Sequence, residues 1–336
     1  MFSSNDTLIS FIARWASERP HQTALRGKRN GEWYSVSYSD YWQNVQAISR
    51  AFISFGLLEG ECVAFLGANY PEWVQLQFGV QAARGVPAPI YMTSTEEQLA
   101  YIVAHSRSKF AVVDDEVQLG RVLQAEREAR FPKLHKIISF QKVETSDERV
   151  LSFDEVLQLG KNLEKTTANK RLEELQDDDT CLLIYTSGTT GVPKGVEIDH
   201  GGQLVVGAAV MDFYPAFLEE GRYKSLSYLP LTAQAEQCFT NVFTLITGGE
   251  ASFCPDLSQL KDYLVDVRPT VFLGMPRVWE KFEAALQARL AEATGFRARL
   301  LKWARQTELN AFHEQVRRGD PSYMPLPRRL ARSLVL

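Results

Sequence analysis

The sequence of 336 residues has few cysteines and no paired cysteine motif. Its four cysteines, Cys62, Cys181, Cys238 and Cys254, stand far apart, and none belongs to a Cys-x-x-Cys pair. Structural zinc sites and secreted disulfide frameworks usually show close cysteine spacings, so neither is expected. We expect reduced thiols, mostly in the core, and therefore a cytoplasmic protein.

The chain also lacks long apolar runs and a strong excess of one charge. No apolar run approaches the ~18 residues that a membrane-spanning helix needs. The N-terminus, MFSSNDTLIS, has no basic region followed by an apolar stretch, so no signal peptide is expected. The formal net charge is -4, which gives no reason to expect a nucleic-acid partner. The sequence shows no internal repeat.

Segments with strand and helix patterns alternate along the chain. Apolar residues make up 45% and charged residues 23%, as in ordinary globular proteins. Short apolar runs predict buried strands, with helical periodicity between most of them, at residues 62–66, 86–90, 110–113, 136–140, 225–229, 251–254 and 270–273. This alternation predicts an α/β fold with layered, parallel, doubly wound sheets. We expect a first α/β subdomain over residues 1–175 and a second over residues 176–336.

Prolines and hydroxyl residues give finer predictions around residue 90. Pro87 and Pro89 cannot donate ladder hydrogen bonds, which predicts an edge or irregular strand there. Thr93 or Ser94 is expected to cap the helix that follows. Residues 141–180 are polar and weakly periodic, and no helix is predicted in them.

The stretch CLLIYTSGTTGVPKGV, residues 181–196, has the pattern of a phosphate-binding loop. A short apolar strand ends in a loop rich in glycine and hydroxyl residues, whose backbone N–H groups can surround an anion. It is not a Walker A motif, because Lys194 stands between Pro193 and Gly195 and not before a serine or threonine. The candidate phosphate-binding residues are Thr186, Ser187, Gly188, Thr189, Thr190, Gly191 and Lys194.

The string YTSGTTGVPKG, residues 185–195, resembles the phosphate-loop signature of the adenylate-forming enzymes. SLSYLPL at residues 225–231 and RPTVFLGMPRVWEKF at residues 268–282 resemble later motifs of the long-chain fatty acyl-CoA synthetase branch. The resemblance covers nearly the whole chain and implies the large N-terminal domain of the acyl-adenylate-forming fold.

The resemblance implies ATP-dependent activation of a fatty acid through acyl-AMP, followed by transfer to CoA. ATP, Mg²⁺ and CoA are the implied cofactors. Thr186 and Lys194 would take part in catalysis, and Thr186 would also help to position the metal ion. The implied wall of the acyl pocket contains Gly274, Met275 and Pro276.

The chain departs from the family pattern in three places. Ala233 stands where a histidine is usual, and Gly202 stands where an asparagine is usual. The family's later motifs, including its C-terminal lid domain, cannot be placed before residue 336. We therefore expect an N-terminal portion, incomplete at the C-terminus and inactive alone. The alternatives are a non-catalytic relic, a regulatory or split partner, or a ligase for an acyl carrier protein. The expected partners include a second copy of the chain, in a homo-oligomer, or a complementing C-terminal fragment.

Two charged segments leave two interpretations open. The run Asp177–Asp179 predicts a solvated turn before the strand, with a Mg²⁺ site as the alternative. From Glu280 onward the sequence is helical and basic, which fits either a solvated helical insertion or peripheral contact with an anionic membrane.

Overall fold

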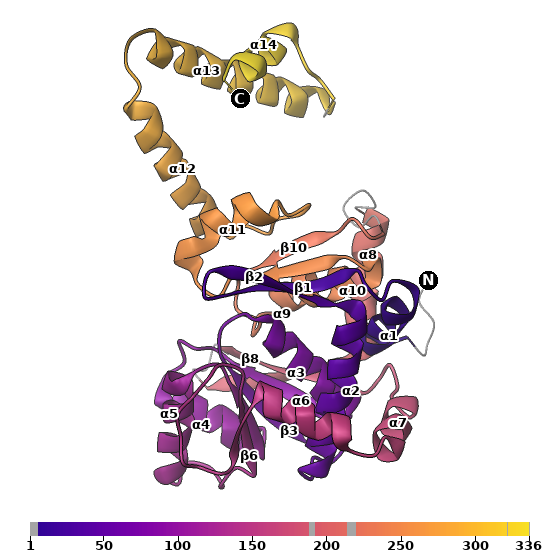
Figure 1. Cartoon of the computed structure of the whole chain (residues 1–336). Helices are drawn as coiled ribbons and strands as arrows, with labels where there is room; N and C mark the ends of the chain where they lie inside the picture. The colour runs from indigo at the N-terminus through magenta and orange to yellow at the C-terminus, as the bar shows by residue number, and fades with distance from the viewer. Residues whose placement is uncertain (1–5, 188–191, 214–219, 321, 336) are drawn as a thin grey trace. The chain divides into compact units, whose positions relative to one another are not determined.

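The structure is a computed structural model that describes residues 6–187, 192–213, 220–320 and 322–335 (Figure 1). Its contacts divide the chain into two compact units, Met1–Phe272 and Leu273–Leu336. The predicted boundary at residue 175 lies inside the first unit. Every strand in the described part of the chain belongs to this unit.

A five-stranded parallel sheet in the order β4-β3-β5-β6-β7 forms one layer of the first unit. Its strands are β3 (Cys62–Leu66), β4 (Val86–Ile90), β5 (Phe110–Val113), β6 (Lys136–Ser139) and β7 (Val150–Ser152). The predicted parallel α/β arrangement is confirmed. β4, which carries Pro87 and Pro89, is an edge strand of this sheet because proline cannot supply a ladder donor.

Five helices alternate with these strands or follow them. They are α3 (Pro71–Ala82), α4 (Glu96–His105), α5 (Glu116–Arg127), α6 (Phe153–Asn162) and α7 (Thr166–Glu173). The sequence did not predict α6 and α7. Ser152 caps α6 reciprocally with Glu155, a capping box that marks a helix start despite the polar surroundings.

A second sheet, in the order β10-β11-β1-β2, contains strands from both the N-terminal and the C-terminal part of the first unit. Its strands are β1 (Thr23–Arg29), β2 (Glu32–Ser37), β10 (Lys224–Ser227) and β11 (Glu250–Phe253). β1 pairs in parallel with β11 and antiparallel with β2. This sheet therefore takes strands from both sides of residue 175, and β1, with the polar sequence TALRGKR, was not predicted.

Helices α1 (Leu8–Glu18) and α2 (Tyr38–Ser54) supply much of the core. One face of α2 forms an apolar stripe, in which Tyr41, Ile48 and Phe52 are almost fully buried. Trp15 of α1 is also buried, and its indole N–H donates to the carbonyl of Leu245 at 2.5 Å. These contacts join the N-terminal helices to the segment that follows β10.

Residues 234–272 form the last segment of the first unit. It contains α9 (Gln234–Gln237), a π-helical turn (Cys238–Val242), α10 (Phe243–Thr247) and, after β11, a 3-10 turn (Leu257–Gln259) and α11 (Leu260–Val267). The strand predicted at residues 270–273 is wrong, because residues 270 and 271 form a bend and residues 272 and 273 have no regular structure. Thr270 donates to the carbonyl of Lys224 at 3.0 Å, at the start of β10, but no ladder continues from it.

The second unit contains three helices, α12 (Pro276–Ala291), α13 (Gly295–Arg318) and α14 (Leu326–Val335), as the helical pattern predicted. Ala304 and Ala311 of α13 are buried, and Glu308 pairs with Arg328 at 2.9 Å and Arg332 at 2.7 Å of α14. Within the described ranges of the whole chain, no helix combines the length and apolarity that crossing a membrane requires.

Candidate functional site at the β8–β9 hairpin

An antiparallel hairpin carries the candidate phosphate-binding loop. β8 (Thr180–Ser187) and β9 (Pro193–Asp199) form a two-stranded sheet of their own, and α8 (His200–Phe213) follows directly. In its register Thr186 is opposite Lys194. Directly opposed residues of antiparallel strands have their Cβ atoms about 5 Å apart, so this hydroxyl and this ammonium group can act on the same ligand. Both residues are exposed.

Of the other predicted loop residues, only Ser187 lies within the described part of the chain. Ser187 ends β8 and pairs with Pro193 across the hairpin. Gly188, Thr189, Thr190 and Gly191 lie outside the described residues, so their predicted role in phosphate binding stays a prediction.

A cavity of about 430 Å³ lies beside the described part of the hairpin. Five of its lining side chains carry hydroxyl groups, those of Tyr91, Thr93, Ser94, Tyr185 and Thr186. Hydroxyl groups can both donate to phosphate oxygens and accept from an ammonium group. The remaining lining residues are Gln98, Ile102 and Pro193.

Thr93 and Ser94 line this cavity because neither caps a helix. The predicted capping role is wrong: Thr95 is the N-cap of α4, and it exchanges hydrogen bonds with Gln98 in a capping box. Arg121 of α5 holds the preceding loop by donating to the carbonyls of Met92 at 3.0 Å and Ser94 at 2.5 Å. The two hydroxyl residues are thereby left in a braced loop beside Thr186.

Tyr185, next to Thr186, fixes β8 against helix α4. Its hydroxyl is 2.8 Å from Nδ1 of His105, and the two rings make an edge contact. Burial, together with nearby Cys62 and Tyr101, raises the pKa of Tyr185 above its ordinary value, so the hydroxyl stays protonated at neutral pH. No motif predicted this contact, because the two residues are 80 positions apart.

The base of the hairpin is fixed by the acidic run before β8. Asp179 accepts from Nε and Nη2 of Arg84, both at 3.1 Å, and its carbonyl accepts from the N–H of His200 at 3.2 Å. The carbonyl of Asp177 accepts from Gly201 at 2.7 Å. Burial opposes ionisation of Asp179, but the hydrogen bonds from Arg84 and from the Gln176 N–H prevail and lower its pKa. The run is thus a structural turn that ties β8 to the start of α8.

The second predicted motif, residues 225–231, and the helix that follows it are held by buried amides. Asn69 donates to the hydroxyl of Ser227 at 2.8 Å and to the carbonyl of Leu229 at 2.6 Å. Gln237 donates to the carbonyl of Leu231 at 2.6 Å. Burial raises the pKa of Glu236 to about 7, although hydrogen bonds from Ser227, Thr240 and two backbone groups oppose the shift.

The two point departures from the family pattern have local structural consequences. The N–H of Gly202 donates to Oδ1 of Asp199 at 2.5 Å, and a Cβ at Gly202 would lie 2.8 Å from that oxygen. A larger residue at position 202 would therefore displace Asp199. Ala233 precedes α9 and is half-buried, while the hydroxyl of its neighbour Thr232 is buried with no hydrogen-bond partner among the described residues.

The predicted acyl-pocket residues begin helix α12 of the second unit. Met275 is its N-cap residue and Pro276 its first residue, and Met275 is about half exposed. The carbonyl of Gly274 accepts from the indole N–H of Trp279 at 2.8 Å, and a Cβ at Gly274 would lie 2.3 Å from that nitrogen. A side chain at position 274 would therefore have to displace the Trp279 ring, and the acyl-pocket role stays a prediction.

The predicted metal site has few donor groups from the protein. Within residues 6–187, 192–213, 220–320 and 322–335, no three His, Cys, Asp or Glu side chains are grouped to hold a metal ion. The acidic run therefore supplies no such group, and the exposed hydroxyl of Thr186 is one neutral oxygen donor. This fits a Mg²⁺ ion that is held mainly by phosphate oxygens and water.

Solved structures identify the class of fold. The adenylation domain of a carboxylate reductase from Mycobacterium chelonae matches with a TM-score of 0.70 and 20% identity, over 87% of this chain and 49% of that chain. The fatty acyl-adenylate ligase of L. pneumophila, solved with acyl adenylate and pyrophosphate, matches with a TM-score of 0.60 and 19% identity, over 78% of this chain and 42% of that chain. The fold is that of the N-terminal domain of adenylate-forming enzymes, as predicted.

The sequence places the chain more narrowly. A family model described as "AMP-binding enzyme" matches residues 12–327, and the chain belongs to this family. It is 32% identical over 322 residues to the long-chain-fatty-acid–CoA ligase ACSBG2 of Gallus gallus, covering 93% of this chain and 41% of that protein. For ACSBG1 of Rattus norvegicus the identity is 31%, over 94% of this chain and 44% of that protein. The chain thus spans less than half the length of these relatives.

Proposed function

We propose that this chain provides the phosphate-binding part of an ATP-dependent ligase that activates a long-chain fatty acid and transfers it to CoA. The observation that carries the proposal is the opposition of Thr186 and Lys194 beside a hydroxyl-lined cavity. Support for the substrates comes from the similarity to long-chain-fatty-acid–CoA ligases.

In the proposed first half-reaction a carboxylate oxygen of the fatty acid attacks the α-phosphorus of ATP. A carboxyl-oxygen–phosphorus bond forms, the bond from this phosphorus to its bridging oxygen breaks, and pyrophosphate leaves. Negative charge grows on the departing group, so fixed donors and cations lower the barrier. The ammonium group of Lys194 would neutralise this charge, and the hydroxyl of Thr186 would donate to a phosphate oxygen. Mg²⁺, when bound, would supply further charge neutralisation.

In the proposed second half-reaction the CoA sulfur attacks the acyl carbonyl, and its thiol proton passes to solvent water. A thioester bond forms, the bond to the phosphate oxygen breaks, and AMP is released. The hairpin has no direct part in this step. A carrier-protein thiol could react in the same way, and direct assay of CoA against a carrier protein as acceptor separates the two.

We further propose that residues 1–336 do not turn over by themselves. The relatives are more than twice as long as the part that this chain matches. The test is ATP–pyrophosphate exchange with a C16 fatty acid on the purified 336-residue chain. No exchange is expected without sequence that corresponds to the rest of the relatives, in the same polypeptide or in a second one. Sustained exchange by the isolated chain would contradict this proposal while supporting the ligase assignment.

A further inference from the structure

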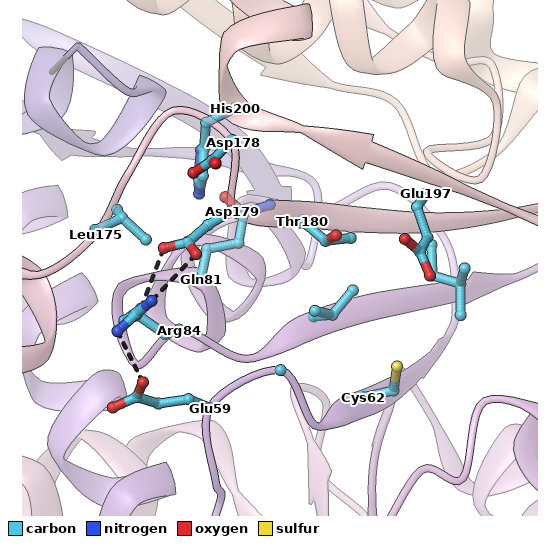
Figure 2. Close-up of a pocket in the computed structure, with 13 residues that line it drawn as sticks. Glu59, Cys62, Gln81, Arg84, Leu175, Asp178, Asp179, Thr180, Glu197 and His200 are labelled. Carbon is cyan, nitrogen blue, oxygen red and sulfur yellow. Dashed lines mark hydrogen bonds and ion pairs between the residues drawn. The ribbon is translucent and has the colours of Figure 1, made fainter. Parts of the chain in front are cut away.

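A second cavity, of about 330 Å³, lies at the base of the hairpin in the first unit (Figure 2). The start of β3, the end of α3, the turn before β8 and the first residue of α8 contribute to its wall. It shares no lining residue with the cavity beside Thr186. A ligand bound here would therefore be separate from the proposed phosphate site.

The wall of this cavity carries an excess of negative charge. Four carboxylates line it, those of Glu59, Asp178, Asp179 and Glu197. Arg84 is the one Lys or Arg among the lining residues, all of which are described. Its guanidinium group already pairs with Asp179, at 3.1 Å, and with Glu59, at 2.7 Å. Asp178 and Glu197 are exposed, and neither forms an ion pair with Arg84.

Two buried acceptor groups add a second, independent observation. His200 is 1% exposed and Gln81 is 2% exposed, and both line the cavity. Nδ1 of His200 and Oε1 of Gln81 have no hydrogen-bond partner among the described residues. In Figure 2 these side chains point toward each other from opposite sides, His200 from α8 and Gln81 from α3. Buried polar groups are rarely left unpaired, because each costs free energy when it is removed from water.

Both Oε1 of Gln81 and the imidazole of His200 can accept a hydrogen bond from a ligand. The Nε2 group of Gln81 donates to the carbonyl of Cys181 at 2.7 Å, so its unpaired Oε1 requires a donor. Burial lowers the pKa of His200 to about 4, against the opposing effect of Asp179 and Asp199. The imidazole is therefore neutral at pH 7, and one of its nitrogens can accept a hydrogen bond.

Anions and metal ions both fit this cavity poorly. An anion would be repelled by the four carboxylates, and the single arginine already pairs with two of them. Across the described part of the chain, no group of three or more His, Cys, Asp and Glu side chains is arranged for a metal ion. We propose that the cavity binds a small organic cation with N–H donors, a primary ammonium or guanidinium group, between the carboxylates of Asp178 and Glu197 and the acceptors of His200 and Gln81.

The test is calorimetric titration of the full 336-residue chain with 1,4-diaminobutane, and with tetramethylammonium as a cation that has no N–H group. Glu197→Gln and Asp178→Asn remove one charge each at exposed positions, so both variants should fold. Each should weaken binding of the diamine by about tenfold, the usual loss for one charge-assisted hydrogen bond. The control is Glu144→Gln, which removes an exposed carboxylate outside the cavity and should leave binding unchanged.

Side-chain ¹⁵N NMR of His200 provides the second measurement. The diamine should shift the Nδ1 resonance in proportion to occupancy, and tetramethylammonium should not. Three results would overturn the proposal: no saturable binding of the diamine, equal binding of tetramethylammonium, or equal losses in Glu197→Gln and Glu144→Gln. The first would mean that water alone satisfies the buried acceptors. None of these results bears on phosphate binding at Thr186 and Lys194, which pyrophosphate titration measures separately.

Discussion

Thr186 and Lys194 are directly opposed in the register of the β8–β9 hairpin. The two residues flank the predicted phosphate loop, and the hairpin brings them together across it. A hydroxyl donor beside an ammonium group is a suitable pair for a phosphate oxygen. The first prediction depends on this pairing.

Replacing Lys194 by alanine should weaken binding of Mg²⁺–pyrophosphate to the chain by roughly 10- to 100-fold, because one charge-assisted contact is lost. Thr186→Val should cost about fivefold, as expected for a neutral hydrogen bond. Isothermal titration of the two variants and the parent chain measures both effects. Lys161→Ala, which removes an exposed lysine from α6, is the control. Parent-like binding by Lys194→Ala would exclude this hairpin as the phosphate site.

Two helical glycines should respond in opposite ways to alanine. A Cβ at Gly160 of α6 would lie 1.9 Å from the carbonyl oxygen of Ala47 in α2, so Gly160→Ala should lower the free energy of unfolding by about 3 kcal/mol. Gly120 in α5 is exposed, and no atom lies within 4 Å of the position that a Cβ would take. Gly120→Ala should therefore raise the free energy of unfolding by roughly 0.5–1 kcal/mol. Urea unfolding measures both. Equal effects would contradict the packing of α6 on α2.

His200 should make unfolding depend on pH. Burial lowers its folded-state pKa from 6.5 to about 4. The neutral form therefore contributes stability that is fully present above about pH 6.5 and is lost as the pH falls toward 4, by about 3 kcal/mol. Asp114 and Glu236 act in the opposite direction, because burial raises their pKa to about 6 and about 7.

The comparison of the parent chain with His200→Gln separates these contributions. The variant should lose less stability than the parent between pH 6.5 and pH 4.5, in urea unfolding at matched ionic strength. An NMR titration of the His200 ring should give a midpoint well below 6.5. A midpoint near the ordinary value would show that the ring is accessible to water.

The second unit should bind vesicles that contain anionic lipid. It carries twelve Lys and Arg residues against six Asp and Glu residues, while the whole chain has a net charge of -4. Leu326, Leu330 and Leu334 repeat every four residues along α14 and are about half or more exposed. An apolar stripe with basic neighbours suits the surface of an anionic bilayer.

Vesicle sedimentation tests this expectation. Leu330→Gln should weaken binding of the chain to vesicles with anionic lipid by about tenfold, because one leucine side chain is no longer buried. Val117→Gln, at an exposed position of α5, should have no effect. Equal binding to neutral and anionic vesicles, or none to either, would favour the alternative of a solvated helical insertion.

Apolar runs and helical periodicity in the sequence predicted the strands and helices that bury one continuous set of apolar side chains. The strands at Cys62–Leu66 and Phe110–Val113 are short apolar runs, and the stripe of α2 has a clear helical period. β1 was missed because Arg26 and Lys28 interrupt its apolar pattern, and its pairing with β11 bridges more than 200 residues. The strand predicted at residues 270–273 was wrong because an apolar run without a ladder partner does not make a strand.

The candidate site could be predicted only where the signature is continuous. Thr186 and Lys194 were predicted because they belong to one motif, and their role in phosphate binding stays a prediction. Thr93 and Ser94 were not assigned to the site, because their position depends on Thr95 taking the cap of α4 and on Arg121 bracing the loop. Such contacts between distant segments leave no periodic signal in the sequence.

Photolabelling with an ATP analogue that carries an azidoanilide on the γ-phosphate tests the central claim most directly. After trypsin digestion, mass spectrometry should find the label in the peptide from Leu172 to Lys194, and excess pyrophosphate should prevent the labelling. The comparison region is the cavity of about 700 Å³ whose lining includes the cations Lys28, Arg29 and Lys142 and the carboxylates of Glu72 and Asp154. Label in peptides from that cavity, with none between Leu172 and Lys194, would contradict the account.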